Sequence, residues 1–197
     1  MKGLIYGGKN LDRVRTVIGI SGSSGVAYAA RLLEVVRGEK ILVVSENAKG
    51  ILEHEGPATF EDLRSRSSVI YEDDDLFAPI SSGSQKFDSM VIVPCSQSTL
   101  AKVANGIADT LITRAASVAM KEGRRLILVP RETPVSAIML ENELKLSRLG
   151  VMILPANPGF YHRPLTVADL VDFVVGKILD QLGQENSLYT RWKEGQA

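Results

Sequence analysis

A turn rich in glycine and serine, "SGSSG" at residues 21–25, is the first stretch of this chain whose residue types suit chemistry. An apolar run ends just before it at Ile20, and an amphipathic pattern begins directly after it. Glycines let a backbone approach a ligand closely, and the free N–H groups at the start of a helix favour an anion. The turn therefore predicts a site for a mononucleotide phosphate or a flavin edge, although a tight strand-to-helix turn needs glycine in any case.

The turn does not match either of two common nucleotide motifs. Ile20 stands at the first glycine position of G-x-G-x-x-G, and no G-K-[ST] follows as it would in a P-loop. Four more polar clusters follow apolar runs of the same kind. They are "SENA" (45–48), "PCSQST" (94–99), "PRETP" (130–134) and "PANPGFYHRP" (155–164). Because ligands of open parallel α/β sheets bind at the carboxyl ends of the strands, these polar ends together predict one site there.

Basic residues stand near these clusters or among apolar neighbours. Arg114 and Lys121 are seven residues apart and share one helical face, and Arg131 precedes Glu132 in "PRETP". Lys177 interrupts the apolar pattern "LVDFVVGKILDQL". Each of these basic residues alone is typical of a solvated charge whose aliphatic chain lies along apolar neighbours. Together they are suited to bind a small anionic substrate.

Cys95 and the two histidines, His54 and His162, give little support for other chemistry. A single Cys at the end of a buried strand is more typical of a small apolar side chain than of a nucleophile. A nucleophilic Cys would also need a neighbouring base. With two histidines and no cluster of spaced carboxylates, we expect no metal site.

Five continuously apolar segments must position the polar clusters. These segments show no alternation of apolar and polar residues, which is typical of strands in a parallel sheet that is covered on both faces. The predicted strands are 16–20, 40–45, 89–94, 125–130 and 151–155. The clearest helical patterns between and after them are 25–37, 134–149 and 166–182. Alternating strands and helices predict an α/β fold with helices on both faces of the sheet.

Residues that favour helix ends set the limits of these helices. Thr133 is the predicted N-cap of the second helix, with Pro134 at its first position. Thr166 and Asp169 form a near capping box at the start of the third. The predicted helix stops are Gly38, Gly150 and Gly183.

The composition of the whole chain limits the classes of protein. At 197 residues, with 45% apolar and 23% charged residues, it predicts a single globular domain. A formal net charge of zero gives no support for a nucleic-acid or membrane partner, and a single Cys excludes an intrachain disulfide. Because the first residues are too polar for a secretory signal, we expect a cytoplasmic protein. Segment 57–88 is predicted to be loop apart from one short strand at 68–71.

Four motifs carry a family resemblance that covers nearly the whole chain after about residue 14. They are "GISGSSGVAYAARLLE" (19–34), "VPRETPVSAIMLENELKLSRLG" (129–150), "PGFYHRP" (158–164) and "DLVDFVVGKILDQLG" (169–183). They closely resemble the flavin prenyltransferase family (UbiX type), long called aromatic-acid decarboxylases. The resemblance implies a Rossmann-like or flavodoxin-like three-layer sandwich with a parallel sheet. It implies one flavoprotein domain over 1–197, with an N-terminal extension at 1–14 and a C-terminal tail at 184–197.

The resemblance also implies an activity. Members of the family join dimethylallyl phosphate to reduced FMN, at N5 and C6 of the isoalloxazine, without a metal. The product, prenylated FMN, serves UbiD-type decarboxylases. The family implies a homo-oligomer, a dodecamer, with sites between subunits. The implied cofactor and partners are therefore FMN, dimethylallyl phosphate, a UbiD-type decarboxylase and further copies of this chain.

Position by position, the resemblance assigns residues to these roles. It implies that FMN is bound by Gly22, Ser23, Ser24, Ser45, Ser96, Gln97, Ser98, Thr99 and Arg131. It implies that the substrate is bound by Tyr161, Lys177, Arg114, Lys121, Glu132 and Trp192. Arg114, Lys121 and Glu132 come either from the same subunit as Tyr161 and Lys177 or from a neighbouring one. The implied catalytic residues are Glu132, Lys121, Arg114, Glu55 and Ser24. Two positions depart from the family: Ser23 replaces the usual alanine of the turn, and Lys177 keeps the charge, but not the bidentate geometry, of an arginine found there.

Two alternatives stay open at this point. A flavin-dependent cysteine decarboxylase of the same superfamily would carry a P-x-x-N-x-x-M segment and an essential His, and "PANPGFYH" departs from that pattern. A flavin carrier without chemistry of its own would not need the basic residues around Tyr161 and Lys177. A prenyltransferase differs from the carrier because its flavin spectrum changes when dimethylallyl phosphate is added under reduction.

Overall fold

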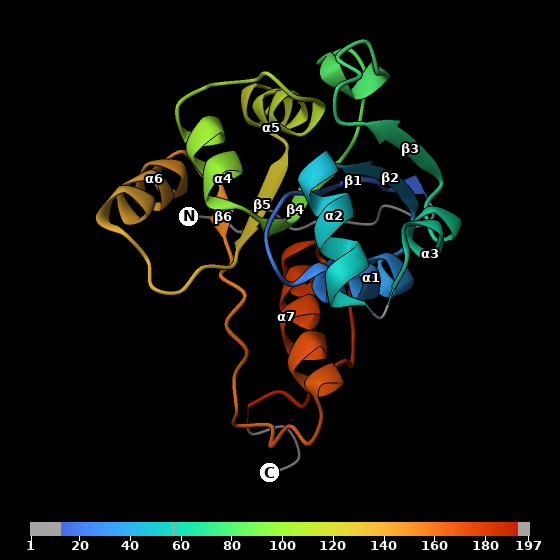
Figure 1. Cartoon of the computed structure of the whole chain (residues 1–197), viewed down its shortest axis with the longest axis vertical. Coiled ribbons are helices and arrows are strands. Elements are labelled where there is room, and N and C mark those ends of the chain that lie inside the picture. The colour runs from blue at the N-terminus through green and yellow to red at the C-terminus, as the bar shows by residue number, and fades with distance from the viewer. Residues whose placement is uncertain (1–12, 57, 193–197) are drawn as a thin grey trace.

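The computed structural model describes residues 13–56 and 58–192. These residues form a parallel sheet in the strand order β3-β2-β1-β4-β5-β6 (Figure 1). The strands are β1 Arg15–Ile20, β2 Glu39–Val44, β3 Val69–Glu72, β4 Ser89–Cys95, β5 Arg125–Pro130 and β6 Met152–Ile153. The predicted parallel sheet is confirmed, and the strand order reverses between β1 and β4.

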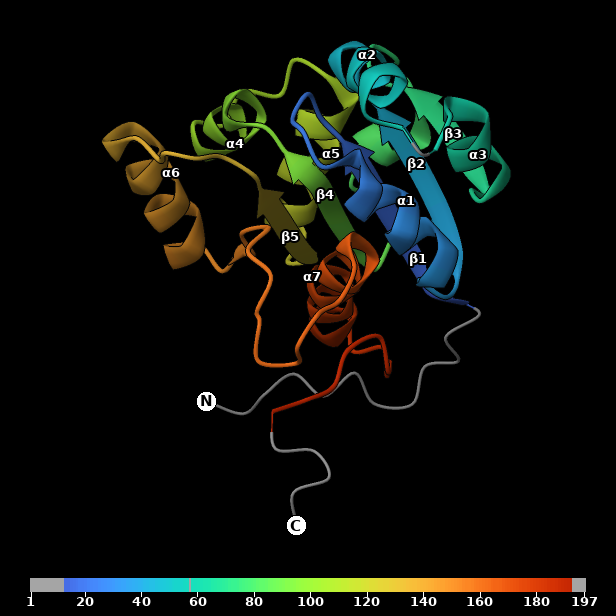
Figure 2. The same cartoon turned by 60° about the horizontal axis from the view of Figure 1, so that its bottom comes forward.

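Helices cover both faces of the sheet. They are α1 Val26–Val35, α2 Glu46–Glu55, α3 Phe60–Ser65, α4 Gln97–Ala104, α5 Leu111–Lys121, α6 Ala137–Arg148 and α7 Val167–Gln181, with a 3₁₀ turn at Pro79–Ser81. Helices α1 and α7 lie side by side on one face (Figure 2), while α4, α5 and α6 bury their apolar sides with the other. The predicted three-layer sandwich is confirmed.

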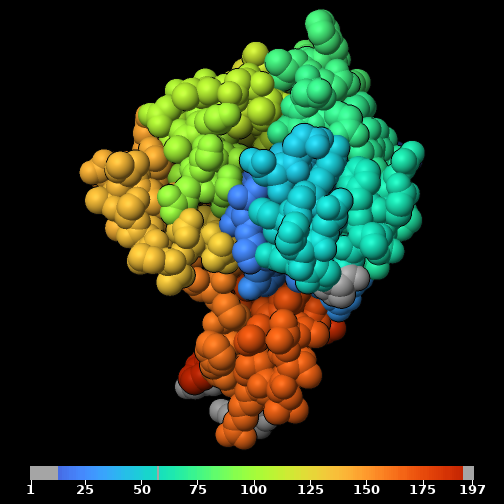
Figure 3. Space-filling model, in the orientation of Figure 1, coloured from blue at the N-terminus to red at the C-terminus, as the bar shows by residue number. Residues whose placement is uncertain are grey.

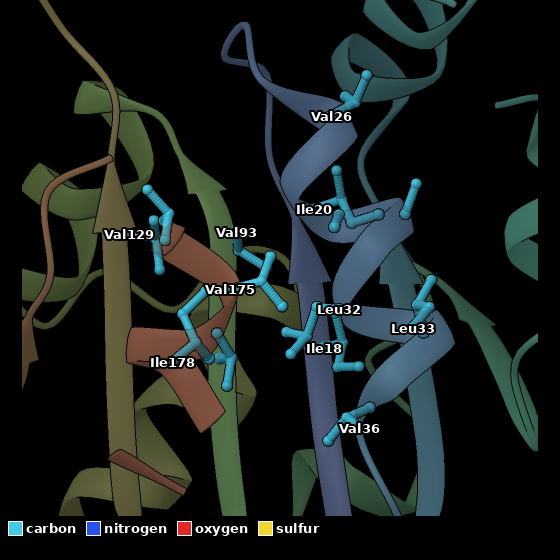
Figure 4. Close-up of a cluster of buried hydrophobic side chains, with 14 of the residues drawn as sticks. Ile18, Ile20, Val26, Leu32, Leu33, Val36, Val93, Val129, Val175 and Ile178 are labelled. Carbon is cyan, nitrogen blue, oxygen red and sulfur yellow. The ribbon is translucent and has the colours of Figure 1, made fainter. Parts of the chain in front are cut away.

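The buried side chains of each strand alternate between the two faces. Ile18 and Ile20 of β1 belong to the core between the sheet and α1 and α7. Figure 4 shows them next to α1, with Val175 and Ile178 of α7 in the same cluster. Val17 of the same strand belongs to the opposite core, with α4 and α5. Because both faces are covered, the strands show no polar alternation in the sequence.

One helix start was predicted wrongly. Ser136, not Thr133, is the N-cap of α6, and its Oγ accepts a hydrogen bond from the N–H of Met139 at 3.3 Å. Both residues carry a hydroxyl group that can cap a helix, and both precede the apolar pattern. The path of the chain away from β5 decides which of the two hydroxyl groups caps the helix. Because the helix begins after Ser136, Pro134 lies before it rather than at its first position.

Other predicted limits differ less. The first helix ends at Val35 rather than 37, and the last strand is shorter than 151–155. Segment 57–88 holds α3, which begins at a capping box between Thr59 and Asp62. Six residues are too few to show a helical period, and this is why the sequence pattern missed α3. The capping box of Thr166 and Asp169 is confirmed.

The two ends of the chain are only partly described. Residues 1–12 of the predicted extension and 193–197 of the predicted tail lie outside the described residues. Residues 184–192 of the tail run close to α7 (Figure 1). Within the described ranges, no helix is both long and apolar enough to cross a bilayer.

Candidate functional site

A cavity of about 480 Å³ lies at the carboxyl ends of the strands. Figure 3 shows the hollow at this place, where the blue segment after β1 runs between α4 (lime) and α2 (cyan). Glu132 lines the cavity, together with every residue that the resemblance assigned to FMN: Gly22, Ser23, Ser24, Ser45, Ser96, Gln97, Ser98, Thr99 and Arg131. The strand ends thus gather these residues in one place, as expected where the strand order of a parallel sheet reverses.

Two serines of the glycine-rich turn hold the wall of this cavity together. Ser21 Oγ accepts the N–H of Ser96 at 2.8 Å and donates to the carbonyl of Pro94 at 3.1 Å. Ser23 Oγ donates to the carbonyl of Arg131 at 3.0 Å. These bonds join the ends of β1, β4 and β5. Both hydroxyl groups therefore position neighbouring strand ends as well as the turn itself.

Glu55 lies at the start of α1. Its carboxylate accepts the N–H of Gly25 at 3.0 Å and that of Val26 at 3.2 Å, and it bonds to the Ser24 side chain. Burial opposes its charge, yet these hydrogen bonds and the nearby Arg131 hold the pKa of Glu55 below its ordinary value. The helix-start donors that the sequence indicated for a phosphate are thus engaged by a carboxylate in this chain.

Three further helices begin at the cavity, each with a hydroxyl cap. Ser45 Oγ accepts the N–H of Ala48 at the start of α2, at 3.3 Å. Ser96 Oγ accepts the N–H of Thr99 at the start of α4, at 3.2 Å, and Thr110 caps α5. Because helix starts carry partial positive charge, an anionic group is stabilised at this edge.

Arg131 lines the cavity, and its side chain carries a hydrogen-bond donor without a partner among the described residues. Its Nε is buried and makes no hydrogen bond with the described part of the chain. Buried donors in folded proteins are nearly always paired. A flavin presents carbonyl oxygens, ring nitrogens and phosphate oxygens that accept such bonds. The residues present therefore fit the FMN that the family resemblance implies.

A second group of predicted residues gathers around α7 and is not part of the cavity lining. The ring of Tyr161 packs edge-on against that of Trp192, with centroids 5.4 Å apart, and against that of Phe173, at 5.7 Å. Lys177 Nζ lies 5.1 Å from the ring centroid of Tyr189 and 5.7 Å from that of Phe173. Helix α7 and the segments beside it thus bring Tyr161, Lys177 and Trp192 together.

Comparison with known proteins decides the family. The Flavoprotein family matches residues 7–179. A flavin prenyltransferase UbiX of Thermoplasma acidophilum is 57% identical over 180 residues, which cover 91% of this chain and 100% of that protein. The flavin prenyltransferase UbiX of Methanocaldococcus jannaschii is 47% identical, over 91% of this chain and 98% of its own. The chain belongs to the flavin prenyltransferase UbiX family.

Solved structures of UbiX proteins share the fold. A dodecameric FMN-dependent UbiX-like decarboxylase from Escherichia coli O157:H7 superposes with a TM-score of 0.88 at 43% identity, over 91% of this chain and 99% of that one. AnUbiX, solved with FMN and dimethylallyl pyrophosphate, superposes with a TM-score of 0.89 at 37% identity, over 91% and 97%. The Rossmann-like or flavodoxin-like architecture is confirmed, and the chain is a flavoprotein of a transferase family.

Two of the basic residues assigned by the UbiX resemblance lie apart from the α7 group. Arg114 and Lys121 are exposed on α5, and Lys121 Nζ is 3.3 Å from Glu122 Oε1. Helix α5 packs on the face of the sheet opposite α7. The sequence left open whether these residues meet Lys177 within one subunit or between subunits. Their placement on opposite faces favours the second arrangement.

Sequence reasoning missed part of the cavity lining, most notably Asp73. This residue follows β3 and accepts the N–H of Ile112 at the start of α5, at 2.8 Å. Burial raises the pKa of Asp73, although hydrogen bonds from Ile112 and Thr110 oppose the rise. The run "EDDD" after the predicted strand 68–71 could have indicated it. The other missed residues are Asn47, Ile51, Lys102, Thr110, Ile112 and Thr113.

Cys95 belongs to the core rather than to the chemistry of the site. It is 1% exposed, and burial raises the pKa of its thiol, so the thiol stays protonated. This agrees with the interpretation of Cys95 as a small apolar side chain. Within the described residues, no group of three or more His, Cys, Asp and Glu side chains is placed to hold a metal ion. That the reaction needs no metal stays a prediction.

Proposed function

We propose that this chain binds FMN in the strand-end cavity and joins the dimethylallyl group of dimethylallyl phosphate to reduced FMN, at N5 and C6, to make prenylated FMN. The UbiX relatives support the activity, and the AnUbiX complex supports the pairing of FMN with a dimethylallyl donor. The buried, unpartnered Nε of Arg131 in a cavity lined by hydroxyl groups carries the proposal, because it is a donor prepared for a polar cofactor.

The chain supplies position and charge to this reaction. Reduced FMN, when bound, supplies the electron-rich ring atoms that accept the prenyl group. Arg131 donates a hydrogen bond to the flavin. The helix starts capped by Ser45 and Ser96 favour its anionic part. Holding both reactants in one orientation removes much of the entropic barrier between them.

The departing phosphate needs positive charge, since its oxygen keeps both electrons of the broken carbon–oxygen bond. Arg114, Lys121 and Lys177 supply that charge, and Tyr161 donates a hydrogen bond. Fixed donors aimed at developing charge are commonly the largest contribution to the rate. Because α5 and α7 lie on opposite faces of the sheet, Arg114 and Lys121 of one copy serve Tyr161 and Lys177 of another.

Glu132 moves a proton in this scheme. It lines the cavity beside Arg131, and its Oε1 accepts the N–H of Thr133 at 3.2 Å. As an acid it would protonate the leaving phosphate, while N5 gives up its own proton. As a base it would take the proton lost from C6. One carbon of the dimethylallyl double bond would gain a proton in exchange, through the electrons of that double bond, and its other carbon would form the bond to C6 with electrons of the ring. Ser24 and Glu55, bonded to each other at the start of α1, are further candidates for proton transfer around the ring.

The proposal includes the partners of the reaction. The product serves a UbiD-type decarboxylase, and the protein assembles as a homo-oligomer, for which the dodecameric Escherichia coli protein is the precedent. Trp192, which is 69% exposed beside Tyr161, covers the substrate. Because AnUbiX was solved with dimethylallyl pyrophosphate, both dimethylallyl phosphate and dimethylallyl pyrophosphate are candidate donors.

The test is an anaerobic assay with FMN-loaded protein, a reductant, one of the two donors and a chelator, followed by mass spectrometry of the released cofactor. Wild-type protein is expected to yield prenylated FMN. Glu132→Gln and Lys121→Ala proteins are expected to purify yellow and to react about 10²–10³ times more slowly, the loss typical of one fixed donor at a developing charge. Lys86→Ala is the matched control, because Lys86 is exposed at the amino end of β4, away from the cavity.

Each other outcome counts against a named part of the proposal. Wild-type rates in both variants would refute the roles of Glu132 and Lys121. Colourless variants would mean that these residues hold the flavin or the fold. No reaction of the wild type with either donor would favour the carrier alternative, and release of a dinucleotide would refute FMN.

A further inference from the structure

One carboxylate of α7 binds three side chains of the segment that follows this helix. We call residues 184–192 the strap. Asp180, in the last turn of α7, accepts hydrogen bonds from Tyr189 Oη at 2.8 Å, from an Arg191 guanidinium nitrogen at 2.7 Å and from Asn186 Nδ2 at 3.0 Å. Three strap side chains therefore converge on one residue.

The backbone of α7 is shaped to receive the strap. A Cβ at Gly176 would lie 2.6 Å from Cδ1 of Tyr189, closer than real contacts allow, and 3.0 Å from Oδ1 of Asn186, a tight contact. Asn186 Nδ2 also donates to the carbonyl of Gly176, at 3.2 Å. The glycine thus provides the space into which the strap packs. Two of the side chains that bond to Asp180, those of Tyr189 and Asn186, therefore also pack against Gly176.

Electrostatics at Asp180 favour the docked strap. Burial opposes its charge, yet the hydrogen bonds from Arg191 and Tyr189 hold the pKa of Asp180 below its ordinary value. Burial and the bond to Asp180 raise the pKa of Tyr189 to about 12. The Tyr189 hydroxyl therefore remains a donor, and Asp180 an acceptor, at neutral pH.

The docked strap contacts the residues to which the proposed function assigns substrate binding. The ring of Tyr189 lies 5.1 Å from Lys177 Nζ, and the ring of Trp192 lies edge-on to that of Tyr161 at 5.4 Å. An ammonium over an aromatic face is attracted to it, which limits where Lys177 can point. Tyr189 and Trp192 thus support Lys177 and Tyr161 from the side of the strap.

We propose that Asp180 is a positioning residue, which docks the strap so that Lys177 and Tyr161 are held in place for the phosphate of the substrate. The inference rests on the proposed function. It adds that the affinity for dimethylallyl phosphate depends on the Asp180 carboxylate, although this carboxylate does not contact the substrate. A merely electrostatic role for Asp180 has the opposite consequence. Removing a negative charge near a phosphate site would strengthen phosphate binding, whereas undocking the strap weakens it.

Asp180→Asn distinguishes these two roles, since it keeps the shape of the side chain and removes the charge. We expect the KM for dimethylallyl phosphate to rise about tenfold with kcat little changed, the size expected for one lost charge-assisted hydrogen bond. FMN content should stay at the wild-type level. The Asp180→Glu variant should recover part of the affinity, because it restores the charged acceptor.

Asp172→Asn is the matched control. Asp172 lies on the same helix, its side chain is 23% exposed against 21% for Asp180, and it pairs with Arg31 of α1 at 2.6 Å instead of with the strap. We expect its loss to lower the stability without changing the KM. If Asp180→Asn fails to fold, Tyr189→Phe replaces it, since this variant removes one strap bond and keeps the ring; a smaller rise in KM is expected.

Trp192, the single Trp of the chain, reports strap docking without any turnover. Quenching of its fluorescence by iodide in the FMN-loaded protein should increase in Asp180→Asn and not in Asp172→Asn. Equal quenching in the wild type and Asp180→Asn, or an unchanged or lowered KM in Asp180→Asn, would overturn the inference. A wild type that consumes no donor would refute the proposed function instead, while the quenching comparison would still test strap docking.

Discussion

Arg131 is placed at the cavity by β5, and its carbonyl is held there by the Ser23 hydroxyl at 3.0 Å. Its guanidinium lies close enough to Glu55 to lower the pKa of that carboxyl, after the larger effects of burial and hydrogen bonding. Arg131 lines the cavity, and its buried Nε makes no hydrogen bond within the described residues. A single residue thus connects the end of a strand with the start of α1, at the cavity where we propose that FMN binds.

Replacing Arg131 tests this connection. We expect Arg131→Met protein to bind FMN about 10 to 100 times more weakly than the wild type, because a charged donor to a buried acceptor is lost. Arg131→Lys should recover only part of the affinity, since an ammonium lacks the planar set of donors. Flavin fluorescence titration of the protein freed of its flavin measures the effect. Arg64→Met is the control, because Arg64 is 65% exposed on α3; unchanged affinity in Arg131→Met would refute the role of Arg131.

At the scale of elements, the starts of several helices form part of the cavity wall. Helices α2, α4 and α5 begin at the cavity with hydroxyl caps, while α1 begins with its donors bound by Glu55. Each strand ends where the next helix must start, so the capping residues and the site residues are often the same. Helices α3, α6 and α7 differ, because their caps are not part of the cavity lining: Thr59, Ser136 and Thr166. All three caps, Ser136 among them, are exposed.

Ser136 therefore allows a test of capping that is separate from the site. Ser136→Ala should lower the free energy of unfolding by about 1 kcal/mol, because the N–H of Met139 loses its acceptor. Thr133→Ala, at the position that the sequence pattern favoured, should lower it by much less. Urea unfolding of both variants provides the comparison. A larger loss in Thr133→Ala would show that the helix starts earlier than the structure places it.

At the scale of the whole molecule, α6 exposes an apolar stripe. Leu140 and Leu144, four residues apart on one side of the helix, are 55% and 51% exposed, while Met139 and Leu146 are buried against the sheet. Apolar side chains that share an exposed stripe favour burial against another surface. A second copy of this chain is the occupant that we expect, because the proposed site needs α5 and α7 from different copies.

Substitution of this stripe should change the assembly and leave the fold intact. We expect wild-type protein to be larger than a dimer by light scattering at micromolar concentration. The double variant Leu140→Glu, Leu144→Glu should give smaller species with a similar melting temperature, since both side chains are exposed in the single chain. Lys145→Glu is the control, with the same change in net charge on a different side of α6. A monomeric wild type would contradict the oligomer.

Several features were predictable from the sequence because they depend on neighbours along the chain. Continuous apolar runs predicted the strands, and the polar clusters after them predicted the edge at which the cavity lies. The Thr166 and Asp169 capping box needs only three residues of separation, and it was found correctly. The long motifs predicted the family. All of these signals depend on residues that are close together in the chain, so they can be recognised without knowledge of the fold.

Other features were decided only by tertiary structure, because they depend on residues far apart in the chain. The Glu55 carboxylate binds the N–H of Gly25, thirty positions away, so the first turn holds a carboxylate that no spacing rule indicated. Asp73 reaches the start of α5 across 39 positions, and its run of acids looked like a solvated loop. The basic residues of α5 and Lys177 have similar sequence surroundings, yet packing places them on opposite faces of the sheet. Burial and long-range hydrogen bonds, which a one-dimensional pattern does not encode, decide which of these charges meet.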